Sequence, residues 1–274
     1  HWWWQCPIDP EDGGIVELDT LITGAQVIDG TGAPRRAADV GIRAGRIAAI
    51  TEPGGLAAAT PRTTVDATGR ILAPGFIDIH THSDVTLLDN PGGESKVHQG
   101  VTTEVTGNCS YSPFPIGEPG PEPMRGLMRS ALDTTADWTW TDLDGSARTH
   151  ERAGMSINLA PLVGHAPVRI AAGVDADRPP NDAELAHMRR PIAESIEQGA
   201  WGMSTGLTLA PSSFAHTDEL VALASAMRPY PGAFYASHAR VWAGNIVGAV
   251  QEAADIGERG GVPVQYSHIA IFKA

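Results

Sequence analysis

The sequence predicts an α/β protein whose larger part is an incomplete (β/α) barrel. From residue 74 onward, short runs of apolar and β-branched residues alternate with stretches whose apolar side chains recur at helical spacing. An open doubly wound sheet is the competing architecture, but no Gly-x-Gly-x-x-Gly fingerprint follows any of these runs. The runs give about six of the eight strands of a closed barrel. They cover residues 75–82, 102–108, 156–163, 202–209, 233–238 and 262–268.

A small β-module precedes these strands. Asp-Gly and Ala-Gly turn signals separate its β-like runs, which cover 18–27, 40–43, 46–50 and 63–66. We therefore expect an incomplete β-sandwich over residues 18–73 and the partial barrel over 74–274. Residues 1–17, which contain three consecutive tryptophans, are predicted to be a disordered or foreign tail. The appearance of both ends predicts a fragment of a longer chain.

Amphipathic helices are predicted between the barrel strands. The first begins at Asn181 or Asp182 and contains Pro191, which predicts a kink or a break. Its apolar face consists of Leu185, Met188, Ile192 and Ile196. A later helix is expected to present a face of Ile246, Val250 and Ala254. Residues 114–150 have poor periodicity, which predicts a long loop with some helix.

The composition excludes several kinds of partner. Lys and Arg number 19 and Asp and Glu number 32, so the formal charge is −13. Such an acidic surface argues against binding to nucleic acid or to anionic membranes.

No apolar run reaches transmembrane length. The two cysteines, Cys6 and Cys109, do not make a disulfide framework, which predicts a reducing compartment and a cytoplasmic protein.

Two histidines at the end of the first barrel strand are candidate metal ligands. His80 and His82 are two residues apart, so an extended strand would place both side chains on one face. A pair of neutral imidazoles is suited to binding a transition metal. A His-x-His sequence alone is a weak signal, and the other strands have to complete the site.

Three further ligand-type residues follow other predicted strands, namely Cys109, His238 and His268. The last two are thirty residues apart, roughly one β-α-β step. Because parallel strands bring their carboxyl ends to one mouth, we expect all five side chains to gather there. Thiolate and imidazole ligands favour Zn²⁺ over Mg²⁺ or Ca²⁺. The pattern therefore predicts a zinc site.

The remaining histidines divide into two groups. His165 also follows a predicted strand and is a candidate for the lining of the pocket. Those in helical or loop stretches are interpreted as ordinary surface or core residues, and they are His98, His150, His187 and His216.

Three segments resemble the amidohydrolase superfamily and, within it, the D-aminoacylase (N-acyl-D-amino-acid deacylase) family. They are GFIDIHTHSD at 75–84, GVTTEVTGNCS at 100–110 and GLTLAPSSFA at 206–215. The Gly-Asn-Cys sequence is the most specific, because most amidohydrolases place a carboxylated lysine where this family uses cysteine to bridge metals. The chain has no lysine between residues 97 and 272, so the carboxylated-lysine centre of dihydroorotases and hydantoinases is hard to build here. The resemblance extends from about residue 18 to the end of the sequence.

The resemblance implies a zinc-dependent hydrolase of amide bonds. It assigns a tightly bound zinc to Cys109, His238 and His268, and a second, weaker metal to His80 and His82 with Cys109 shared. In this family a metal-activated water attacks the amide carbonyl of an N-acyl-D-amino acid. The implied partner is therefore a small N-acylated amino acid or a related amide.

The sequence also departs from the family. The general base is an Asp on the eighth strand, which is expected beyond Ala274, so no catalytic base is assigned here. Ala270 stands where the family often has a lysine for the substrate carboxylate, and Lys273 or Arg240 are the available replacements. His165 and Arg240 are thus the candidate substrate-binding residues. Two alternatives stay open: hydrolysis of another amide or cyclic amide, and an inactive metal-binding fragment that aggregates.

Overall fold

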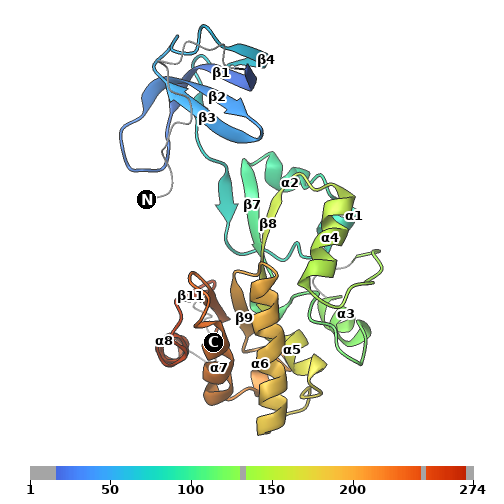
Figure 1. Ribbon diagram of the computed structural model, residues 1–274. Coiled ribbons are helices and arrows are strands. Elements are labelled where there is room, and N and C mark those ends of the chain that lie inside the picture. The colour runs from blue at the N-terminus through green and yellow to red at the C-terminus, as the bar shows by residue number, and fades with distance from the viewer. Residues whose placement is uncertain (1–16, 130–133, 242–244, 270–274) are drawn as a thin grey trace. The chain divides into compact units, whose positions relative to one another are not determined.

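The computed structural model of the chain describes residues 17–129, 134–241 and 245–269. It divides between Gly75 and Phe76 into two units, a sheet followed by an α/β unit (Figure 1). The predicted tail, 1–17, lies outside the described residues except for Glu17, which begins the first strand.

The N-terminal unit is a five-stranded sheet with β1 at its centre. Its strands are β1 (Glu17–Val27), β2 (Arg36–Arg43), β3 (Arg46–Thr51), β4 (Thr60–Asp66) and β5 (Ile71–Leu72). β1, β2 and β3 pair antiparallel, whereas β4 and β5 both pair with β1 in parallel. Leu18, Leu21 and Ala25 of β1 are buried in two small apolar clusters that hold the sheet together.

The second unit is built on six parallel strands that pair in chain order from β6 to β11. Its strands are β6 (Phe76–Asp78), β7 (Val101–Thr106), β8 (Asn158–Gly164), β9 (Gly202–Gly206), β10 (Phe234–His238) and β11 (Val264–Tyr266). The sheet curls into a half-barrel, and within the described residues no strand joins β11 to β6. The prediction of an incomplete parallel barrel with about six of eight strands is confirmed.

Helices connect the strands of the half-barrel. They are α1 (Thr86–Asp89), α2 (Glu94–Val97), α3 (Glu122–Met128), α4 (Leu143–Ala153), α5 (His165–Ala171), α6 (Asp182–Glu197), α7 (Thr217–Ala224) and α8 (Ile246–Gly260). From α5 to α8, each helix packs against the next. Val163, Met203 and Tyr235 of the strands form the largest core with Met188 and Leu220 of the helices. In the described part of the chain, no helix is long and apolar enough to span a membrane.

Helix α6 agrees with the sequence prediction in all but one respect. The Asn181 side chain accepts a hydrogen bond from the Glu184 N–H at 2.9 Å, and the Glu184 carboxylate accepts one from the Asn181 N–H at 2.8 Å. This reciprocal pair is a capping box. The predicted break at Pro191 is absent, because α6 continues through it and keeps Met188 and Ile192 fully buried on either side.

The predicted face of α8 is wrong. Val250 is 42% exposed, whereas the buried residues of this helix include Ala249, Ala253 and Ile256. Small residues let a helix approach its neighbours closely, and here Gly260 lies so near Ala224 of α7 that an added Cβ would come within 2.8 Å of its side chain. The packed face of α8 therefore consists of Ile256 and several small residues, rather than of Ile246, Val250 and Ala254.

Candidate metal centre

The five predicted ligands lie at or just after the carboxyl ends of strands of the half-barrel. His238 is the last residue of β10, and Cys109 lies in a 3-10 turn (Asn108–Ser110) after β7. His268 follows β11 by two residues. The strand predicted at 75–82 ends at Asp78, so His80 and His82 lie in the segment after it rather than on one strand face.

The sulfur of Cys109 lies between two imidazoles. Its Sγ is 3.3 Å from Nε2 of His80 and 3.4 Å from Nε2 of His268. The three donor atoms lie within 4.8 Å of one another. A tetrahedral zinc with Zn–S of about 2.3 Å and Zn–N of about 2.0 Å separates its sulfur and nitrogen ligands by about 3.5 Å. The spacing and the donor types therefore fit a zinc ion.

The other two histidines extend this arrangement on either side. The ring centroid of His82 is 5.4 Å from that of His80, and the centroid of His238 is 4.5 Å from that of His268. Nε2 of His238 contacts the Thr208 hydroxyl at 2.7 Å, which leaves Nδ1 as its free nitrogen. Nδ1 of His80, His82 and His238 is buried with no hydrogen-bond partner among the described residues. A buried nitrogen without a partner is available to a metal, and at His238 it is the nitrogen that Thr208 leaves free. At His80 the nitrogen that faces the sulfur is Nε2 instead.

Burial sets the protonation of these side chains. Burial, reinforced by the neighbouring His268, lowers the pKa of His80 and of His238 to about 4. Burial, with the nearby Asp84 carboxyl, raises the pKa of the Cys109 thiol to about 12. Neutral imidazole is the form that binds metal, whereas the thiol has to lose a proton.

The backbone at Cys109 is held in an unusual conformation. Cys109 and Ser110 have φ of +52° and +75°, a region that costs roughly 1–2 kcal/mol for a residue with a Cβ. Gly107 begins the turn with φ of +74°, and a Cβ there would lie 2.0 Å from the carbonyl oxygen of Leu162. The Ser204 hydroxyl donates to the Gly107 carbonyl and accepts from the Ser110 N–H at 3.0 Å. Contacts from the neighbouring strands thus aim the sulfur.

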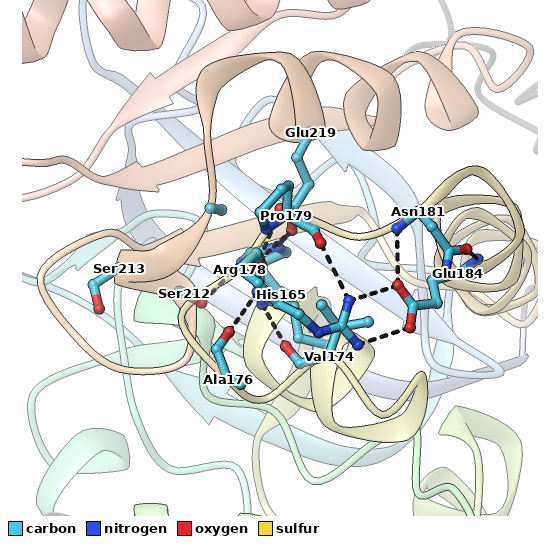
Figure 2. A network of polar contacts seen from close by, with 12 residues as sticks. His165, Val174, Ala176, Arg178, Pro179, Asn181, Glu184, Ser212, Ser213 and Glu219 are labelled. Atoms are coloured by element: carbon cyan, nitrogen blue, oxygen red, sulfur yellow. Dashed lines mark hydrogen bonds and ion pairs between the residues drawn. The ribbon is translucent and has the colours of Figure 1, made fainter.

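His165, the candidate for the lining of the pocket, lies in the interior of the half-barrel unit. It begins α5 and is fully buried. Its Nδ1 lies 2.9 Å from the Ser212 hydroxyl and its Nε2 lies 2.9 Å from the Glu219 carboxylate (Figure 2). With both ring nitrogens engaged by protein, the predicted contact with substrate finds no support here.

Arg240 is also committed to the protein. Its guanidinium donates to the carbonyl oxygens of Ser213 and Ala215 at 2.8 and 2.6 Å. It pairs with Glu252 at 3.4 Å as well. These bonds hold the loop after β9. A contact between Arg240 and substrate, as predicted, would have to compete with them. Lys273, the other candidate replacement, lies outside the described residues, as does Ala270.

The sequence profile of the Amidohydrolase family matches residues 63–256, more than half of the chain. The chain belongs to the amidohydrolase family. Within the family it is similar to two proteins of Alcaligenes xylosoxydans xylosoxydans. It is 41% identical to an N-acyl-D-aspartate deacylase over 263 residues, which are 94% of this chain and 50% of that protein. It is 42% identical to an N-acyl-D-glutamate deacylase over 253 residues, which are 92% of this chain and 50% of that protein.

A solved structure of this family carries the same fold. It is an N-acyl-D-glutamate deacylase from Bordetella bronchiseptica in complex with zinc and a phosphonate inhibitor that mimics the tetrahedral intermediate. The TM-score is 0.81 at 39% identity, covering 90% of this chain and 50% of that one. The chain thus spans about half the length of the relatives it matches.

Two polar residues near the candidate metal centre of this amidohydrolase were not identified from the sequence. Thr208 contacts His238. It lies just after β9, in the segment 206–215 that carries the resemblance, and this position could have marked it as a candidate site residue. Asp84 lies in segment 75–84 and is buried. Burial, with the nearby Glu104 carboxyl, raises the pKa of Asp84 to about 8. Its place in that segment offered the same signal as for Thr208, but the sequence does not show that this carboxyl is buried.

Substituting alanine for Gly206 tests whether the backbone aims the sulfur. A Cβ at this position would lie 2.4 Å from the carbonyl oxygen of Cys109, so the turn has to move. We expect zinc affinity, measured by competition with a chelating dye, to fall by at least about tenfold. Gly126→Ala is the matched control, because a Cβ there meets nothing within 4 Å. Equal zinc affinity of Gly206→Ala and wild type would contradict the expectation.

Proposed function

We propose that this chain supplies the metal-binding part of a zinc-dependent hydrolase that removes the acyl group from N-acyl-D-amino acids. The observation that carries the proposal is the Cys109 sulfur, which lies 3.3 and 3.4 Å from imidazole nitrogens of His80 and His268. The two relatives at 41% and 42% identity are named for N-acyl-D-aspartate and N-acyl-D-glutamate, which supports acidic D-amino acids as the substrate class.

In this proposal the ligand residues have distinct tasks. Cys109 is the central ligand, shared between the tightly bound zinc with His238 and His268 and a second, weaker metal with His80 and His82. The Thr208 hydroxyl fixes the ring of His238 through Nε2, so that Nδ1 is the atom presented to the metal. Zinc, when bound, polarises the amide carbonyl and lowers the pKa of water. The metal-ligand cluster of the described residues includes no carboxylate oxygen, so a general base, the Asp of an eighth strand in the family pattern, is needed in addition.

Two other functions follow from specific observations. Ala270, in place of a lysine, favours an amide other than an N-acyl-D-amino acid, including a cyclic amide. The half-barrel leaves β6 and β11 without a further strand among the described residues, which favours a chain that binds metal without turnover.

The deciding experiment combines metal analysis with a substrate panel. The purified chain is loaded with zinc and assayed on N-acetyl-D-aspartate, N-acetyl-D-glutamate, their L-enantiomers and a hydantoin. Turnover of the D-compounds alone supports the first function, and turnover of the L-compounds or the ring alone favours the second. Bound zinc without any turnover favours the third. Absence of zinc, with Cys109 and the histidines intact, overturns the proposal.

We further propose that the protein works in a reducing compartment, the cytoplasm. Cys109 is a free, buried cysteine, and a metal-binding thiol has to stay reduced. The net charge of −13 gives no basis for a nucleic-acid or membrane partner. The proposed partner is a small N-acylated amino acid.

Zinc affinity is expected to rise with pH, because binding displaces the thiol proton. With a thiol pKa of about 12, Cys109 carries its proton across neutral pH, whereas His80 and His238, with pKa of about 4, have already lost theirs. Between about pH 7 and pH 9 the affinity should therefore increase about tenfold per unit. Calorimetry in buffers of different ionisation enthalpy counts the released proton. A pH-independent affinity would show that no thiol proton is lost.

A further inference from the structure

A chain of buried hydrogen bonds connects the turn at Cys109 to a distant carboxylate. The Ala166 N–H donates to the Ser110 hydroxyl at 2.6 Å, and the Ser110 and Ser212 hydroxyls are 2.5 Å apart. Ser212 contacts Nδ1 of His165, whose Nε2 contacts Glu219, both at 2.9 Å (Figure 2). All four side chains are at most 5% exposed.

The bonds along this chain have one consistent direction. A carboxylate only accepts, so Nε2 of His165 donates to Glu219 and Nδ1 accepts from the Ser212 hydroxyl. Ser212 then accepts from the Ser110 hydroxyl, which accepts from the backbone. This arrangement requires neutral imidazole, and burial lowers the pKa of His165 although Glu219 opposes the shift. Every donor in the series has an acceptor.

The far end of the chain is firmly anchored. Arg169, fully buried in α5, donates from Nη1 to both carboxylate oxygens of Glu219 at 2.8 and 2.7 Å. Its Nε donates to the carbonyl oxygen of Val174 at 2.8 Å, and its Nη2 to that of Arg178 at 2.9 Å. This charge-assisted contact of one nitrogen with both oxygens, together with the extra bonds of the same guanidinium, fixes the position of the carboxylate.

We propose that Glu219, His165 and Ser212 are positioning residues that fix the left-handed turn at Cys109 and so hold its sulfur at the metal centre. The inference rests on the proposed zinc site. A φ of +75° at Ser110 is unfavourable for a residue with a Cβ and persists only where the surroundings impose it. The hydroxyl of Ser110 is tied to Ser212 and to the backbone of α5, which supplies that constraint. The Ser-His-Glu series is not assigned as a nucleophilic triad, because Ser212 is 0% exposed and its hydroxyl is already bonded to Ser110.

Two substitutions of His165 separate the two halves of the series. The side-chain oxygen of asparagine overlaps Nδ1 of histidine and still accepts from Ser212, whereas the side-chain nitrogen of glutamine overlaps Nε2 and bonds only to Glu219. Cobalt(II) titration of the full chain, read from the thiolate-to-cobalt charge-transfer band, reports both affinity and the Cys109 ligand. We expect His165→Gln and Ser212→Ala to bind cobalt about 10–100-fold more weakly. His165→Asn, which keeps the bond to Ser212 but loses the anchor at Glu219, should fall between these variants and wild type.

A buried hydroxyl outside the series provides the control. Thr205 is 0% exposed and its hydroxyl contacts that of Tyr235 at 2.7 Å, so Thr205→Val should lower the unfolding temperature and leave the cobalt affinity unchanged. If folded Ser212→Ala and His165→Gln bind cobalt with wild-type affinity and show an unchanged charge-transfer band, the positioning role is overturned. The proposed zinc site is not affected by that result. A wild-type chain without the band, or a Cys109→Ser chain with the same cobalt affinity, overturns the zinc site and the inference with it.

Discussion

Replacing Cys109 with serine is expected to weaken zinc binding by more than about 100-fold, since loss of outer partners of a metal centre alone costs about 10–100-fold. A hydroxyl is a far poorer zinc ligand than a thiolate, and this sulfur is the atom that contacts both His80 and His268. Because serine is nearly the size of cysteine and the residue is 5% exposed, the fold should survive. Zinc content after dialysis and chelator competition measure the loss.

His187→Gln is the control for this experiment. His187 lies on the exposed side of α6 and is interpreted as an ordinary surface histidine, so its loss should leave zinc affinity unchanged. His268→Gln should behave like Cys109→Ser. Stoichiometric zinc that withstands dialysis in Cys109→Ser would show that the metal uses other ligands.

The convergence of the ligands was predictable because each lies at or just after the end of a predicted strand. His238 and Cys109 are marked by the strand that precedes them, and parallel strands leave their carboxyl ends at one edge. The pairing of the ligands was not predictable, because the sulfur contacts one histidine of each predicted pair, His80 and His268. Which imidazole nitrogen faces inward depends on tertiary partners such as Thr208.

The buried network around His165 shows where sequence reasoning stops. Its position after a strand was found, but its role depends on Glu219, which is 54 residues away. Glu219 lies in the first turn of α7, where an acidic side chain is favoured by the helix dipole and would ordinarily be solvated. Only the packing of α7 against its neighbours turns this carboxylate inward, and no local pattern records that contact.

Replacing Arg169 with methionine is expected to destabilise the fold by about 3–5 kcal/mol, the cost of removing one partner of a buried ion pair. Arg169 is 0% exposed and is bonded to both oxygens of Glu219. Methionine fills much of the space but leaves a carboxylate buried without its cation. Burial acts to raise the pKa of Glu219. The hydrogen bond from His165 and the charge of Arg169 outweigh burial, so the pKa lies below its usual value. Urea unfolding followed by circular dichroism measures the change.

Arg178→Met provides the comparison for Arg169→Met. Arg178 donates from Nη1 and Nη2 to the two oxygens of Glu184 at 2.7 Å, so it is also paired with a carboxylate, but its side chain is 43% exposed (Figure 2). Exposed ion pairs contribute little, so its unfolding midpoint should stay close to wild type. In the double variant Arg169→Met with Glu219→Gln, part of the lost stability should return, because the uncompensated charge is gone. If Arg169→Met unfolds at the wild-type urea concentration, Glu219 is not held as a buried carboxylate by this arginine.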